Sequence, residues 1–166
     1  MSVSPARVRE AVAEVPDPEI PALTIEDLGI LREVSVERGQ VVVTITPTYS
    51  GCPAMDAIRG EIHERLQALG AADAEVRTVL SPAWTTDWMS DEGRRKLREY
   101  GIAPPTGGAA AGRPGSGPAQ LVPLGVCCPR CGSFDVRELS RFGATACQAQ
   151  YSCQACLEPF DHFKAH

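Results

Sequence analysis

The sequence predicts an α+β fold, in which a small sheet with packed helices is followed by a small zinc-ribbon domain. Over residues 1–103, short β-rich runs alternate with amphipathic helical runs, which is typical of a mixed domain. A run rich in Gly, Ala and Pro then spans residues 104–124, and all four phenylalanines and six of the seven cysteines come after residue 124. We therefore expect an α+β domain over 1–103, a flexible linker over 104–124 and a zinc ribbon over 125–166.

Charge and composition exclude several classes of function. Nucleic acids and anionic membranes bind clustered positive charge, whereas this chain has a formal net charge of −5 and a pI near 5.2. No run approaches the roughly 18 apolar residues of a membrane span, and we see no apolar signal-peptide stretch near the N-terminus. We expect a cytoplasmic protein, in which seven cysteines indicate metal or redox chemistry rather than disulfides.

The first predicted helix covers residues 7–15, where valines and alanines recur at helical spacing, and Pro16 ends it. Three prolines among residues 16–21 then hold two carboxylates, Asp17 and Glu19, in a stiff irregular loop. One interpretation makes these carboxylates functional. The alternative is a solvated turn, or a turn in which Asp17 caps the backbone after the helix.

A β-hairpin and a strand–loop–helix unit follow. The runs 31–36 and 41–46 flank a short turn containing Gly39, which predicts two antiparallel strands. After the second strand, Pro53 suits the first position of a helix and places Cys52 at its cap. Because a helix N-terminus stabilises an anion, we expect the thiol of Cys52 to lose its proton readily and to ligate a metal or act as a nucleophile. The alternative is a small packed residue that fills the loop.

The remainder of the first domain has ordinary structural signals. A helix is predicted from 53 to about 69, with its apolar face toward the core, His63 on its wet face and Gly70 as its stop. A strand over 74–80 and a short helix over 91–100, capped by Ser90 or Asp91, follow. We expect the two tryptophans of the loop between them to plug the end of the sheet, with a substrate platform as the alternative.

Two C-x2-C pairs form the strongest motif in the chain. Each such turn aims two sulfurs at one point, and two facing turns complete a tetrahedral site of four thiolates. The predicted ligands are Cys128, Cys131, Cys153 and Cys156. The intervening runs 136–142 and 144–151 are long enough for two antiparallel strands, as in a zinc ribbon. So short a unit cannot bury enough surface to fold alone, so metal binding would supply the missing free energy.

Other residues near this motif are assigned no ligand role. Cys127 would give the wrong spacing, Cys147 is expected to be a packed residue, and His162 and His166 are superfluous once four thiolates fill the shell. The closed pattern favours zinc, although four thiolates could also hold iron or a cluster. The ribbon has four basic and four acidic side chains, which again argues against DNA binding.

These motifs resemble a known family at both ends of the chain. The segments 17–21 (DPEIP), 27–30 (DLGI) and 46–53 (TPTYSGCP) are similar to the small domain of SufT-type iron-sulfur assembly factors. The segments 128–133 (CPRCGS), 145–147 (TAC) and 158–164 (EPFDHFK) resemble the ribbon of the PaaD (PaaJ) family. One departure is the ending Lys-Ala-His at 164–166, which lacks a cysteine found before the final histidine in relatives.

The resemblance implies an accessory protein of the phenylacetyl-CoA 1,2-epoxidase in aerobic phenylacetate degradation, without turnover of its own. Its partners would be the oxygenase and reductase components. Cys52 would be the reactive cysteine, and Asp17 and Glu19 would form the acidic loop. Together they would handle an iron-sulfur cluster or iron transiently, alone or with ligands from a second chain. The ribbon would hold a structural zinc. Two rivals are a non-catalytic adaptor in which Cys52 only packs, and a thiol enzyme, which lacks an evident base because His63 is on the wet face.

Overall fold

The structure is a computed structural model that describes residues 3–106 and 125–165. It divides into two compact units, Met1–Gly93 and Arg94–His166. This division differs from the boundary at residue 103 that the sequence suggests, because strand β4 (Ile102–Ala103) pairs with a strand near the end of the chain. Most of the predicted linker, residues 107–124, lies outside the described residues. No helix in the described ranges is long and apolar enough to cross a bilayer.

The first unit contains a three-stranded sheet in the order β1-β2-β3. Strand β1 (Leu31–Glu37) pairs antiparallel with β2 (Gln40–Ile45), which pairs in parallel with β3 (Glu75–Thr78). The predicted hairpin is confirmed, and its two-residue turn places Arg38 at φ 53° and Gly39 at φ 86°. Two positive φ angles match the twist of the flanking strands, so the turn sets the register of the pair.

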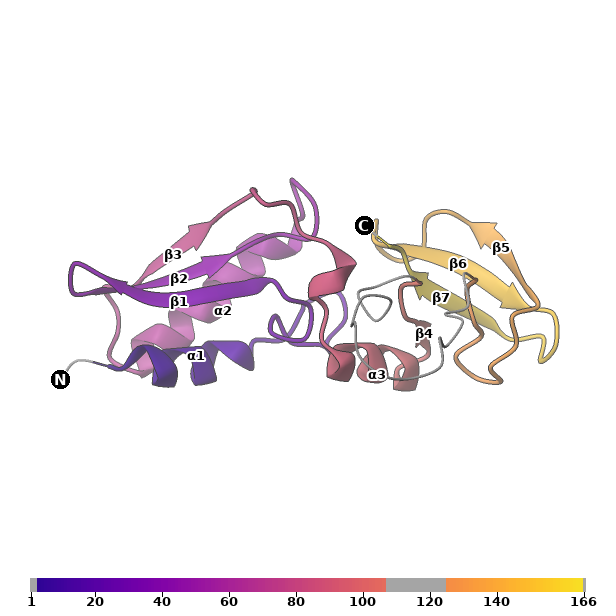
Figure 1. Cartoon of the computed structure of the whole chain (residues 1–166), viewed down its shortest axis with the longest axis horizontal. Helices are drawn as coiled ribbons and strands as arrows, with labels where there is room; N and C mark the ends of the chain where they lie inside the picture. The colour runs from indigo at the N-terminus through magenta and orange to yellow at the C-terminus, as the bar shows by residue number, and fades with distance from the viewer. Residues whose placement is uncertain (1–2, 107–124, 166) are drawn as a thin grey trace, which may run out of the picture. The chain divides into compact units, whose positions relative to one another are not determined.

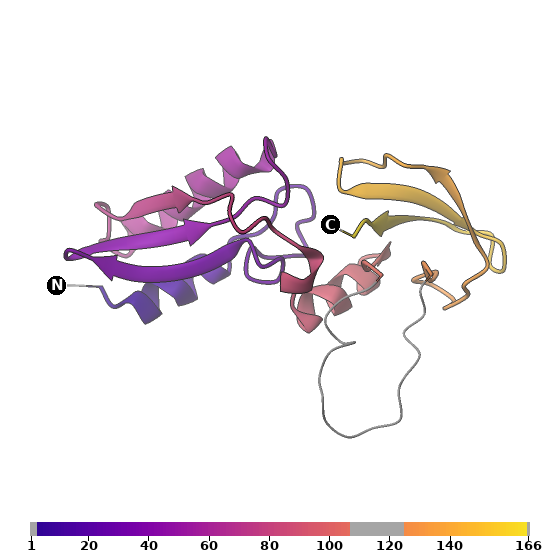
Figure 2. The same ribbon diagram turned by 45° about the horizontal axis from the view of Figure 1, so that its top comes forward.

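Two helices cover one face of this sheet, as Figures 1 and 2 show. Helix α1 (Pro5–Ala13) begins with a proline after the cap Ser4, and α2 (Ala54–Ala68) ends before Gly70 at φ 76°. Valines from all three strands stand side by side across the sheet, namely Val34, Val43 and Val76. The helices bury the residues that the periodicity predicts: Val8, Val12, Met55, Ile58, Ile62 and Leu66. At the edge of the sheet, Arg77 forms ion pairs with Glu37 and Glu75.

The segment after β3 clamps the loop that precedes β1. The indole Nε1 of Trp84, a buried residue, donates to the carbonyl of Leu28 at 2.8 Å, and the backbone N–H of Ser90 donates to the carbonyl of Asp27 at 2.9 Å. Gly29 has φ 71°, and a Cβ on it would lie 2.7 Å from Cβ of Trp88. The short helix η1 (Thr86–Trp88) therefore packs directly on a glycine, and this tight contact fixes the path of the chain into β1.

The second unit is built on a four-stranded sheet in the order β4-β7-β6-β5. Strands β5 (Val136–Ser140) and β6 (Gln148–Cys153) form the predicted antiparallel pair. Strand β7 (Pro159–Phe163) pairs antiparallel with β6 and in parallel with β4, and neither β4 nor β7 is predicted by the sequence pattern. Helix α3 (Asp91–Glu99) forms as predicted, with the hydroxyl of Ser90 accepting from the N–H of Gly93 at 2.9 Å.

Candidate metal centre and thiol loop

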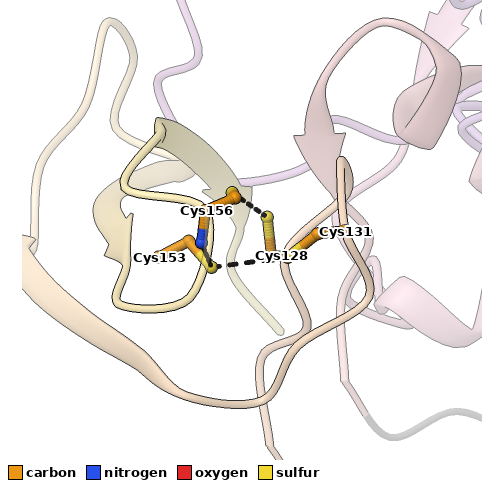
Figure 3. A group of neighbouring side chains, drawn as sticks. All are labelled: Cys128, Cys131, Cys153 and Cys156. Atoms are coloured by element: carbon orange, nitrogen blue, oxygen red, sulfur yellow. Dashed lines mark hydrogen bonds between the residues drawn. The ribbon is translucent and has the colours of Figure 1, made fainter.

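Four cysteine sulfurs converge in the second unit, as Figure 3 shows. The Sγ atoms of Cys128 and Cys156 are 3.7 Å apart, those of Cys131 and Cys153 are 3.6 Å apart, and all four lie within 4.8 Å of one another. A tetrahedron with metal–sulfur bonds of about 2.3 Å has edges of about 3.8 Å. The donor set and its spacing therefore fit a zinc ion held by four thiolates, which would supply charge neutralisation and cross-linking rather than reactivity.

The two cysteine turns have the same backbone geometry. The N–H of Cys128 donates to the carbonyl five residues later, Ser133, at 2.9 Å, and the N–H of Cys153 donates to the carbonyl of Glu158 at 3.0 Å. In each turn the residue after the second cysteine takes a positive φ, 76° at Gly132 and 64° at Leu157. A leucine is disfavoured in this conformation. The sequence pattern gives no sign of this conformation, because only the first turn has a glycine there.

Backbone N–H groups of the second turn favour the thiolate form of Cys153. The N–H of Cys156 lies 3.5 Å from Sγ of Cys153, and this contact is the largest of several that lower the pKa of Cys153 to about 7. Burial and the neighbouring thiols raise the pKa of Cys156 to about 12. Cys128 and Cys153 belong to a small apolar cluster with Ala103 and Phe160. The sulfurs therefore combine polar support from the backbone with apolar packing, an arrangement that suits a bound metal.

The remaining thiols and the histidine of the ribbon lie outside this group of four. Cys127 points its sulfur at the carbonyl of Cys128, 3.6 Å away, and the buried Cys147 contacts the hydroxyl of Thr145 at 3.0 Å. The ring of His162 is buried, with Nδ1 3.2 Å from the carbonyl of Ala103, and burial lowers its pKa. This histidine joins β7 to β4. His166 is outside the described residues.

Cys52 lies in the loop between β2 and α2 and is half-buried. The predicted helix start is one residue early, because α2 begins at Ala54 and Pro53 is its N-cap, already in the αR conformation. The carbonyl of Cys52 accepts from the N–H of Met55 at 3.2 Å, and its own N–H donates to the carbonyl of Tyr49 at 3.3 Å. The thiol therefore sits two residues before the helix, on a backbone that is hydrogen-bonded on both sides.

The two carboxylates of the loop 17–21 differ in their surroundings. Asp17 is buried, and its Oδ1 accepts from the N–H groups of Glu19 and Ile20, both at 2.8 Å. Burial raises the pKa of Asp17, although these two donors oppose it. Glu19 is half-buried along the same turn, and its pKa is raised by burial and by the charge of Asp17. Asp17 thus shapes the turn, as the structural alternative suggests.

The structure does not group Cys52, Asp17 and Glu19 as a ready set of three ligands. Among residues 3–106 and 125–165, the four cysteines of the ribbon are the only cluster of three or more Cys, His, Asp or Glu side chains whose ligand atoms lie together. Any metal or cluster bound at Cys52 would therefore need donors from elsewhere. His63, exposed on α2, agrees with its predicted place on the wet face.

Comparison with known proteins identifies the family. A protein of Escherichia coli (strain K12), named as a subunit of a "Putative 1,2-phenylacetyl-CoA epoxidase", is 46% identical over 166 residues, which cover 98% of this chain and 96% of the relative. The chain belongs to the PaaD family. A family model described as the PaaD zinc beta ribbon domain matches residues 115–164, so the zinc ribbon with a structural zinc is established for the second part of this PaaD-family protein.

The first part of the PaaD-family chain is similar to iron-sulfur assembly proteins. A family model described as an iron-sulfur cluster assembly protein matches residues 5–78. A Porphyromonas gingivalis "Fe-S protein maturation auxiliary factor" is 35% identical over 83 residues, 49% of this chain and 78% of the relative. The crystal structure of a DUF59 domain from Bacillus anthracis aligns over 56% of this chain and 90% of its own length, with a TM-score of 0.51 and 26% sequence identity. The α+β fold class is thus confirmed.

Proposed function

We propose that this protein is an accessory factor of a phenylacetyl-CoA epoxidase that assembles or delivers an iron-sulfur cluster or iron, and that it catalyses no turnover itself. The observation that carries the proposal is the joining, in one chain, of an iron-sulfur assembly domain to the zinc ribbon of the PaaD family. The full-length similarity to the E. coli epoxidase protein supports the same pathway, phenylacetate degradation. Its partners would be the oxygenase and reductase components.

Cys52 is the residue to which we assign cargo handling. Its half-buried position lets the thiol meet another molecule, while the hydrogen-bonded loop at the start of α2 holds it in place. One thiol binds a cluster weakly, and the described residues supply no group of three ligands around it. The client, or a second copy of this chain in a homodimer, would complete the site, and such shared ligation suits a carrier that must release its cargo.

Asp17 and Glu19 take different parts in this proposal. Asp17 holds the turn that presents Glu19, since its Oδ1 binds the backbone N–H of that residue. Glu19 is less buried than Asp17, and we assign to it the carboxylate that would meet an incoming iron ion. Carboxylate oxygen is a hard ligand that binds iron without the affinity of a thiolate, so a Cys–Glu pair would favour transfer over storage.

The ribbon, in this proposal, has a separate task. Zinc bound by Cys128, Cys131, Cys153 and Cys156 would fold the unit, which then docks the epoxidase components. A second candidate function follows from the same geometry: a non-catalytic adaptor that docks these components through both units. It is favoured by the absence of a three-ligand group at Cys52 within the described residues and by the structural use of Asp17.

The experiment that separates these candidates measures zinc, iron and acid-labile sulfide per chain. Wild type, Cys52→Ser and Cys127→Ser are purified anaerobically and then subjected to cluster reconstitution. Cys127 is the matched control, because it is also a half-buried free thiol and lies outside the group of four. Carrier function predicts about one zinc in all three proteins, with iron and sulfide in wild type and the control but not in Cys52→Ser.

Zinc alone in all three proteins would overturn the simple carrier and favour the adaptor. A client-completed site is then tested by repeating the reconstitution with each epoxidase component present. Unchanged activity of an epoxidase matured with Cys52→Ser would remove the handling role altogether. Under the adaptor, Cys52 should also resist a thiol reagent in the folded protein.

A further inference from the structure

The four thiols of the ribbon are not equally protected. Cys128 and Cys153, the first cysteine of each pair, are 1% and 0% exposed. Cys156 is half-buried, whereas Cys131 is exposed. The two turns have matching backbone hydrogen bonds, so this inequality comes from what packs around them rather than from the turns themselves.

The protected thiols are held by the core of the unit. The cluster that contains Cys128 and Cys153 also contains Ala103 and Phe160, and Cys156 packs against it together with Val126, Val136 and Tyr151. Moving one of these three cysteines would open the small core. Cys131 has no place in this cluster, so its side chain can leave the centre without that cost.

The space beside Cys131 is open. A Cβ placed on Gly132 would meet no atom within 4 Å, and Arg130 on the other side is exposed. The corresponding residue of the second turn is Leu157 at φ 64°, a conformation in which a leucine has little freedom. Exposure and open surrounding space therefore coincide at Cys131, one of the four ligands.

We propose that Cys131 is the exchangeable ligand of this centre and that a small-molecule thiol replaces it. In the exchange, the bond between the metal and Cys131 breaks and a bond to the incoming thiolate forms. The proton of the incoming thiol passes to the released Cys131, so that charge and electron count are unchanged. The other three cysteines retain the metal in the meantime. This inference is independent of the role of Cys52.

The first test labels the intact protein. Full-length zinc-loaded wild type is treated with a limiting amount of N-ethylmaleimide, and peptide mass spectrometry follows each cysteine. Cys131 should be labelled first among the four ligands, before zinc is lost. Labelling of Cys156 at the same rate, or labelling of all four only as the ribbon unfolds, would overturn the proposal.

The second test follows zinc transfer to a chromophoric chelator. Glutathione should accelerate the transfer from wild type, whereas S-methylglutathione, which lacks the thiol, should not. Cys131→Ser should retain one zinc and release it at least about tenfold faster than wild type, given that even indirect ligand changes cost about that much affinity. Cys153→Ser should lose zinc outright. Equal zinc loss from both variants, or no acceleration by glutathione, would contradict an exchangeable Cys131.

Discussion

The loop at Cys52 and the ribbon centre both present thiols, but they differ in the number of thiols and in how these are packed. The ribbon brings four sulfurs within 4.8 Å of one another and ties three of these cysteines to a core cluster. The loop offers one half-buried thiol ahead of α2. A convergent set of thiolates retains a metal, while a single thiol can only share one. How firmly a metal is held therefore depends on the number of thiolate ligands and on their packing, not on the presence of a cysteine alone.

The two regions also differ in what folds them. The sheet of the first unit is covered by helices that bury a continuous set of aliphatic side chains. The second unit has a small cluster in which two of the four buried members are metal-ligating cysteines. We therefore expect the first unit to be stable without metal and the second to depend on it.

Removal of zinc should produce the largest effect. Structural zinc contributes roughly 10–16 kcal/mol of apparent binding free energy in small zinc domains, far more than the core of this ribbon can replace. A strong chelator should therefore unfold the second unit while the first remains folded, as seen in amide NMR spectra before and after treatment. Collapse of both sets of resonances together would mean that the units fold as one.

Gly29→Ala should destabilise the first unit alone. The substitution places a Cβ against the backbone and Cβ of Trp88 and forces alanine to φ 71°. Strain and overpacking together should lower the free energy of unfolding by about 2–5 kcal/mol. The matched control is Gly60→Ala, inside α2 with open space around it, which should raise stability by about 0.5–1 kcal/mol. Urea unfolding and zinc content are measured together. A fall in bound zinc would show that the stability of the first unit affects zinc binding in the second.

Substitutions at the two positive-φ residues of the cysteine turns should have smaller effects on stability, and the two effects should be opposite in sign. Gly132→Ala should destabilise the zinc-loaded ribbon by about 1–2 kcal/mol, since only backbone strain is added. Leu157→Gly should relieve the same strain, and the greater freedom of glycine in the unfolded chain should offset about 0.5–1 kcal/mol of the gain. Thermal unfolding at saturating zinc measures both, and shifts of the same sign would refute a shared turn geometry.

Asp17→Asn should change how the first unit responds to pH. Burial raises the pKa of Asp17, so the folded state holds this proton more tightly than the unfolded state. Stability should then fall as pH rises from near the ordinary value of about 3.9 through the raised pKa. The amide side chain of the variant keeps an acceptor oxygen for the turn but lacks this dependence. Between pH 3.5 and 7, the free energy of unfolding of the variant should rise relative to that of wild type. A fall relative to wild type would mean that the folded state stabilises the aspartate as an anion.

Local signals were sufficient for most elements and for the metal centre. Gly39 between two β-rich runs predicts the hairpin, and the apolar spacing of residues 54–69 predicts α2 and its buried face, because both depend on neighbours in sequence. The C-x2-C pairs predict the four thiols that the structure brings together. In each case the signal that predicts the structure lies within short stretches of the sequence.

Features that depend on distant partners escaped prediction. Strand β4 has two residues, too few for any periodicity, and it forms only because β7 lies beside it. The contact between Gly29 and Trp88 likewise comes from segments far apart in the chain. The assignment of Cys52, Asp17 and Glu19 to cargo handling stays a prediction, since ligands from another molecule leave no trace in a single sequence.

The position of β7 has a consequence for synthesis on the ribosome. This strand joins β4 to β6 and is made last of the four. Until residues 159–163 leave the exit tunnel, β4 and the hairpin of β5 and β6 have no common partner. A message truncated shortly before this point would yield a chain with all four zinc thiols but without the strand that unites the sheet. Completion of the ribbon therefore requires that residues 159–163 have left the tunnel.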